Sequence, residues 1–123
     1  MLKVHAKNLG TVSVLCLQGR IVNGETEILR EAIHSLSNVS AIILDFARVS
    51  TVDACGLGTM LELREEAQAN GIRFELMNVT RWVSRVLEVT RLDSVFQINS
   101  GVEFFPTVSH RQQDSLTVYA SCA

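Results

Sequence analysis

The sequence predicts a single α/β domain, and three observations support this prediction. Its 123 residues are enough to bury one substantial core but too few for two independent ones. Hydrophobic residues make up 47% of the chain and there is one proline, which is typical of a compact globular protein. Short apolar runs alternate with segments whose apolar residues recur at helical spacing, and this alternation is characteristic of α/β folds.

The first third of the chain predicts a hairpin followed by a helix. Residues 11–17 are rich in β-branched and aliphatic side chains and are ended by Gly19, so they predict a strand. A weaker strand over residues 3–7 would pair with it as an antiparallel hairpin across a turn at residues 8–10. Between residues 24 and 36 apolar side chains recur at helical spacing, and Asn23 stands where the helix cap belongs.

The middle of the chain predicts a central strand and two further helices. The run from Ala41 to Phe46 is almost wholly apolar, so we expect a strand buried on both faces in the middle of the sheet. Asp53 is placed to cap a second helix that ends before Asn70-Gly71. Residues 72–77 predict another strand, and Thr80 is placed to cap a third helix.

The end of the chain predicts a boundary near Pro106. The spacing of Ser100–Glu103 is that of a capping box, which predicts a short final helix that the proline stops. We therefore expect a domain over residues 1–106 and a mobile C-terminal tail over residues 107–123. Alternating apolar residues at 116–119 leave open an edge strand or contact with a second copy, and hence a homodimer.

Composition excludes several classes of function. The net charge of −2 provides no electrostatic footprint for nucleic acid or an anionic membrane. The chain start lacks the apolar core of a signal peptide and no apolar run approaches the roughly 20 residues of a spanning helix, so we expect a cytoplasmic protein without membrane insertion. Three cysteines without a close pair suggest reduced thiols, and neither the histidines nor the glycines are spaced for a metal, cofactor or nucleotide.

The most informative segment is the junction over residues 44–58, where a buried strand leads into a helix. Gly56 and Gly58 lie in the first turns of this helix, where each costs roughly 1 kcal/mol relative to alanine. Helix propensity does not explain them. We therefore expect a close approach to the backbone, either by a neighbouring strand or by an external partner.

This junction resembles the signature of STAS domains, in which a strand ending in an acidic-aromatic pair leads to Asp-Ser-Ser-Gly-Leu-Gly at a helix start. Here the corresponding run is Asp53-Ala54-Cys55-Gly56-Leu57-Gly58. Gln18–Ile21 is similar to the end of the family's early strand, and Asn78–Phe96 to its later helix and following strand, so the resemblance covers about residues 3–105. It implies a small mixed sheet of four or five strands with helices mainly on one face.

In the branch of this family that antagonises anti-sigma factors, a kinase phosphorylates the serine that follows the motif aspartate. Ala54 occupies that position and has no hydroxyl, so phosphoryl transfer there is excluded. The resemblance implies a non-catalytic bacterial regulator of transcription that docks onto an anti-sigma-factor kinase or a related switch protein. The expected binding residues are those of the motif itself: Asp53, Ala54, Cys55, Gly56, Leu57 and Gly58.

Several alternatives stay open at this level. Ser50, Thr51 and Thr59 are the other hydroxyls near the motif, and Cys55 stands where a helix dipole can activate a thiol, which leaves a redox switch open. A structural STAS subunit of a lipid-transport ABC complex would need no phosphorylatable serine. An enzyme with Cys55 as nucleophile is the third alternative, and the sequence shows no positioned base for it.

Overall fold

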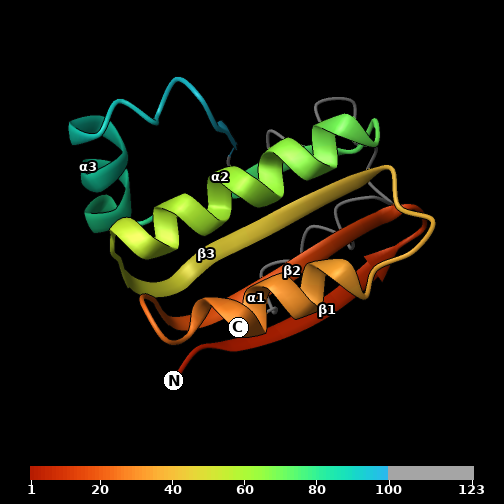
Figure 1. Ribbon diagram of the computed structural model, residues 1–123, viewed down its shortest axis with the longest axis horizontal. Helices are drawn as coiled ribbons and strands as arrows, with labels where there is room; N and C mark the ends of the chain where they lie inside the picture. Colours follow the sequence, from red (N-terminus) through yellow and green to blue (C-terminus); the bar gives the residue numbers. More distant parts are fainter. Residues whose placement is uncertain (100–123) are drawn as a thin grey trace, which may run out of the picture.

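The computed structural model describes residues 1–99, which form a five-stranded sheet with helices packed on one face (Figure 1). The strands lie in the order β1-β2-β3-β4-β5, with β1 antiparallel to β2 and the other neighbours parallel. The prediction of an α/β fold with a small mixed sheet is confirmed. The elements are β1 (Lys3–Leu9), β2 (Val12–Ile21), α1 (Thr26–His34), β3 (Ala41–Val52), α2 (Ala54–Ala69), β4 (Arg73–Met77), α3 (Arg81–Val89) and β5 (Gln97–Asn99).

The main core lies between the sheet and the three helices. Side chains alternate along β3, so Leu44 and Phe46 pack with the buried faces of the helices while Ile43 points to the opposite face. A smaller buried cluster on that opposite face contains Val14 and Met77 from the neighbouring strands. β3 is thus buried on both faces at the centre of the sheet, as its apolar run predicts.

β2 extends further than its sequence suggests. Gly19 was expected to end the strand, but β2 continues to Ile21 with a register shift between Gly19 and Arg20. Gly19 has φ +114°, and a Cβ on it would lie 3.3 Å from the Met1 carbonyl carbon. The expected break is therefore wrong, because this glycine forms a bulge under the N-terminal backbone. The added residues bring Ile21 beside the start of α2.

The caps of α2 and α3 are confirmed, whereas the expected cap of α1 is wrong. Asp53 and Thr80 each accept a hydrogen bond from a backbone N–H in the first turn of their helix. α1 begins only at Thr26, and the side chain of its cap residue, Glu25, accepts no hydrogen bond from the first turn of the helix. Asn23 lies too early to cap it, and its backbone N–H donates to the Asp53 carboxylate instead.

The expectation of reduced thiols is wrong at one cysteine, and the expectations for the C-terminal part of the chain are not tested. Cys16, on β2, is disulfide-bonded, so the expectation of reduced thiols is wrong for this residue. The capping box at Ser100–Glu103, the boundary at residue 106 and the tail over residues 107–123 lie outside the described residues. Within residues 1–99, no helix is both long and apolar enough to cross a bilayer.

Candidate docking site

The motif lies where β3 ends and α2 begins, at one end of the sheet (Figure 1). The backbone N–H of Asp53 donates to the carbonyl oxygen of Ile21 at 3.3 Å, which joins the ends of β2 and β3. The loop that follows β2 carries Asn23, so two segments about thirty residues apart in sequence meet at the motif. The site is therefore built on a rigid strand end and a helix start.

The Asp53 carboxylate accepts hydrogen bonds from the protein's own backbone. Its Oδ1 accepts a hydrogen bond from the Gly56 N–H at 2.8 Å, and its Oδ2 accepts one from the Asn23 N–H at 3.0 Å. These bonds, that from Asn23 first, hold the pKa of the Asp53 carboxyl below its ordinary value. Asp53 therefore fixes the shape of the turn, and neither of its oxygens is left without a backbone donor.

The surroundings of the two motif glycines differ. A Cβ on Gly56 would overlap the carbonyl oxygen of Ile21 and would lie 2.9 Å from its carbonyl carbon, so the β2 backbone requires glycine there. A Cβ on Gly58 would meet nothing within 4 Å in the described part of the chain. Close packing by a neighbouring strand thus explains Gly56. It does not explain Gly58, which leaves space beside the first turns of α2.

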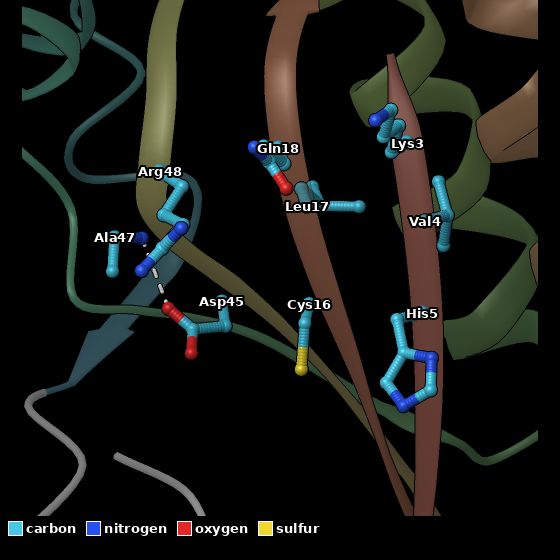
Figure 2. Close-up of a pocket in the computed structure, with 9 residues that line it drawn as sticks. All are labelled: Lys3, Val4, His5, Cys16, Leu17, Gln18, Asp45, Ala47 and Arg48. Atoms are coloured by element: carbon cyan, nitrogen blue, oxygen red, sulfur yellow. Dashed lines mark hydrogen bonds between the residues drawn. The ribbon is translucent and has the colours of Figure 1, made fainter. Parts of the chain in front are cut away.

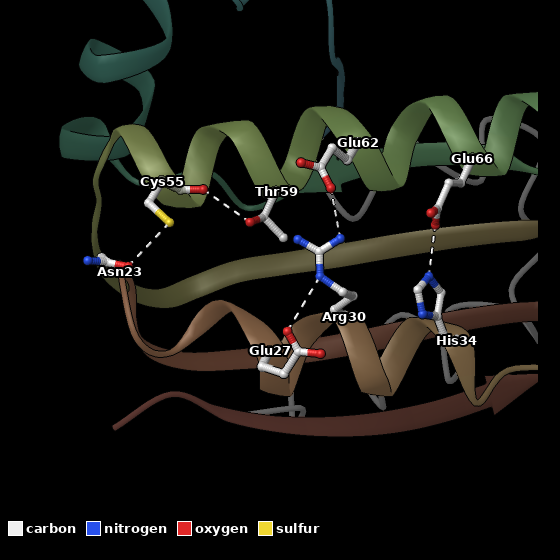
Figure 3. A network of polar contacts seen from close by, with 8 residues as sticks. All are labelled: Asn23, Glu27, Arg30, His34, Cys55, Thr59, Glu62 and Glu66. Atoms are coloured by element: carbon white, nitrogen blue, oxygen red, sulfur yellow. Dashed lines mark hydrogen bonds and ion pairs between the residues drawn. The ribbon is translucent and has the colours of Figure 1, made fainter.

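The other motif residues divide between surface and core. Ala54 and Cys55 are exposed, whereas Leu57 is 7% exposed and belongs to the main core. The thiol of Cys55 points towards the Asn23 side chain, with Sγ 3.7 Å from Oδ1 (Figure 3). The motif therefore presents a small, nearly uncharged surface at residues 54 and 55, held by buried neighbours on either side.

The neighbouring hydroxyls differ in accessibility. Thr59 is 4% exposed, and its hydroxyl donates to the Cys55 carbonyl at 3.1 Å (Figure 3). Ser50 is exposed and donates to the Gly19 carbonyl at 3.3 Å, and Thr51 is also exposed. Burial disfavours Thr59 as a phosphoacceptor, since a kinase must reach the oxygen it modifies.

Polar contacts along one side of α2 connect it to α1 (Figure 3). Arg30 donates to Glu62 at 2.8 Å and lies 3.6 Å from Glu27, and His34 Nε2 lies 2.8 Å from Glu66. The hydrogen bond to Glu62 raises the pKa of Arg30. The partly exposed pairs with Glu62 and Glu66 join α2 to α1 at the surface, where ion pairs contribute little to stability.

A depression on the opposite face of the sheet is lined by Asp45, the acidic residue of β3 (Figure 2). Asp45 is 5% exposed, and its Oδ1 accepts from the Ala47 N–H at 2.9 Å and the Asn78 side chain at 3.3 Å. These bonds fix the strand where its register against β2 shifts. Among the described residues, no group of three or more histidine, cysteine or acidic side chains is placed to hold a metal ion.

A second feature, which no sequence prediction covers, lies beside the motif. A groove of about 240 Å³ lies between the end of β3 and α3. Trp82, on α3, lines it and is 75% exposed. The sequence carries one signal for this exposure, because Trp82 lies outside the helical face formed by the buried residues Val83 and Leu87. The groove is lined by Ser50, Thr51, Val52, Trp82, Val83 and Val86.

Comparison with known proteins relates this geometry to one family. The family model of the STAS domain matches residues 3–110. An anti-sigma factor antagonist from Mycobacterium paratuberculosis is similar with a TM-score of 0.71 at 20% identity, over 80% of this chain and 85% of that chain. The unphosphorylated form of the anti-sigma factor antagonist SpoIIAA is similar with a TM-score of 0.67 at 22% identity, over 90% and 92% of the two chains.

A third similar structure is a sulfate transporter family protein from Wolinella succinogenes. Its TM-score is 0.65 at 18% identity, over 72% of this chain and 75% of that chain. At these identities the likeness to all three structures is one of fold. The same fold thus occurs in antagonists of anti-sigma factors and in a transporter family, and the assignment of function depends on the site.

Proposed function

Because the chain belongs to the STAS domain family, we propose that it is a non-catalytic docking protein whose motif at Asp53–Gly58 binds an anti-sigma-factor kinase or a related switch protein. The single observation that carries this proposal is the exposed turn at Ala54 and Cys55, which lies where the family's antagonists carry their phosphoacceptor serine. We further propose that the protein is bacterial and acts in the cytoplasm, where such a partner would be met.

The motif turn suits a switch because it is small, exposed and close to neutral. A phosphoserine brings about −1.5 to −2 charges, which the start of a helix tolerates but a docked partner opposes through repulsion and lost solvation. Ala54 cannot be modified in this way. The domain therefore stays in the form that docks, and its regulation at this site is absent or lies elsewhere.

The test adds the missing charge at residue 54. Ala54→Asp should weaken binding to the anti-sigma-factor kinase of the same genome by at least about tenfold, measured by isothermal titration calorimetry. Ala54→Ser, without ATP, should bind as the unchanged protein does. Gln68→Glu is the control, since it adds one negative charge at an exposed position about 21 Å further along α2.

The outcomes separate clearly. Equal weakening by Gln68→Glu would mean that net charge, not the motif, controls binding. Unchanged affinity of Ala54→Asp would contradict docking through this turn. With ATP, Ala54→Ser should gain a phosphoryl group and lose the partner, which would show that the kinase reaches this residue.

The second candidate function is a structural STAS subunit of a lipid-transport ABC complex. Ala54 favours it because such a subunit needs no phosphoacceptor, and the similarity to a sulfate transporter family protein is compatible with it. A tagged chain should then co-purify with transporter subunits, and Ala54→Ser should have no effect on that assembly. Co-purification of a kinase-like protein in their place would decide for the first function.

A further inference from the structure

The outer side of α3 presents two large apolar side chains to solvent. Trp82 is 75% exposed and Val89 is 70% exposed. They are seven residues apart on one helix, so they lie on the same side of it, two turns from each other. Burial of Val83 and Leu87 fixes the opposite side of α3 against the sheet, so the stripe of Trp82 and Val89 cannot turn inwards.

Positive charge accompanies this stripe. Arg81 and Arg85 are exposed, one at the start of α3 and one a turn later, and neither forms an ion pair with any residue of 1–99. The acidic residue on α3 is Glu88, towards its other end. The half of α3 that begins at Arg81 therefore carries two guanidinium groups without an ion-pair partner among residues 1–99, beside an exposed indole. This combination is suited to carboxylates with an apolar neighbour.

The same surface is continuous with the motif. The groove of about 240 Å³ has Trp82 and Val86 on one wall and Ser50–Val52 on the other, and the next residue along the chain is the cap of the motif helix, Asp53. Figure 1 shows α3 at the end of the molecule where β3 passes into α2. A partner seated on Ala54 thus extends naturally over the groove towards α3.

We propose that the α3 surface, defined as Arg81, Trp82, Arg85 and Val89, binds an acidic segment of the protein partner, with an apolar side chain of that segment in the groove. The proposal rests on the proposed docking function. Charge complementarity selects the acidic segment, because the two guanidinium groups have no partner within residues 1–99. The groove, sized for a side chain, selects a protein over a flat lipid surface.

The test measures the affinity of the same anti-sigma-factor kinase for variants of this surface. Trp82→Ala, and separately Arg81→Glu with Arg85→Glu, should each weaken binding by about tenfold or more. The control reverses two charges on the other face of the sheet, Lys3→Glu with Arg48→Glu, and should change affinity less than about twofold. Since all substituted side chains are exposed, thermal melts should show every variant folded.

The fluorescence of Trp82 also reports binding at this surface directly, because it is the one tryptophan of the chain. Adding the kinase should shift its emission to shorter wavelength as the indole leaves water. A helical peptide built of glutamate and leucine should cause the same emission shift at higher concentration. A matched peptide with lysine in place of glutamate should not shift the emission.

Each outcome supports or overturns a stated claim. Binding of the kinase with unchanged affinity of both α3 variants overturns this inference and leaves the motif's role intact. Failure of the kinase to bind, with an emission shift by the acidic peptide alone, overturns the proposed function and supports the α3 surface. No shift with either, or a shift with phosphatidylglycerol vesicles but not with the acidic peptide, overturns the α3 assignment.

Discussion

Gly56 and Gly58 offer a matched pair of substitutions with opposite expected effects. Both lie in the first turns of α2, so alanine gains about 1 kcal/mol of helix propensity at either position. At Gly58 nothing within residues 1–99 opposes the new methyl group. Gly58→Ala should therefore raise the free energy of unfolding by about 1 kcal/mol, and the melting temperature by roughly 4 °C.

At Gly56 the new methyl group would overlap the Ile21 carbonyl. Overpacking costs about 1–3 kcal/mol when side chains can move, and a strand backbone gives way less easily, so we take about 3 kcal/mol. After the gain in helix propensity of about 1 kcal/mol, Gly56→Ala should lower the free energy of unfolding by about 2 kcal/mol. The two alanine variants should thus differ by about 3 kcal/mol.

Chemical denaturation followed by circular dichroism measures both values on the same day and in the same buffer. Equal stability of the two variants would refute the reasoning, because it would mean that α2 moves away from β2 at little cost. Loss of stability in Gly58→Ala would show a contact at that position that the described residues do not provide. Gly58→Ala should nevertheless weaken docking if the partner uses the open space there.

Three further predictions concern the residues beside these glycines. The pKa of Asp53 is lowered in the folded protein, so the ionised carboxylate stabilises the fold fully above pH 3.8, the ordinary value, and this stabilisation is lost as pH falls through the lower folded pKa. The melting temperature of the unchanged protein should therefore exceed that of Asp53→Asn by less and less as the pH is lowered through this range. Thr59→Val should change the free energy of unfolding by less than about 1 kcal/mol, whereas Thr59→Glu should cost about 3 kcal/mol or more in the same denaturation assay; a harmless glutamate would reopen Thr59 as a phosphoacceptor. The exposed thiol of Cys55 should react with iodoacetamide at pH 7 within about threefold of the rate of free cysteine, and a much faster rate would support a redox switch.

Patterns that depend on near neighbours in sequence predicted most of the fold. The apolar run at Ala41–Phe46 and the caps at Asp53 and Thr80 are local signals, and each was found in its element, although β3 continues beyond the run to Val52. Gly19 and Asn23 were misread because their conformations depend on residues far along the chain. Gly19 lies under Met1, and Asn23 donates to Asp53.

The motif residues could be named from the sequence, but their arrangement in space could not. Residue types alone placed the glycines in a turn that something approaches closely, yet only the fold shows that the β2 backbone accounts for Gly56 and leaves Gly58 open. The exposure of Trp82 could not be deduced from the sequence, because an aromatic residue next to a buried helical face can lie on either side of that face's edge.

The bridge from the Asp53 carboxylate to the Asn23 backbone joins residues separated by 30 positions. A short synthetic peptide covering residues 50–62 would lack this bridge and the Ile21 carbonyl that shapes the turn. Such a peptide should compete poorly for the partner even though it contains every motif residue. Because the turn takes its shape only when β2 is in place, a partner that binds the turn binds only a chain whose sheet has formed. Such a partner would distinguish the folded protein from a nascent or damaged chain.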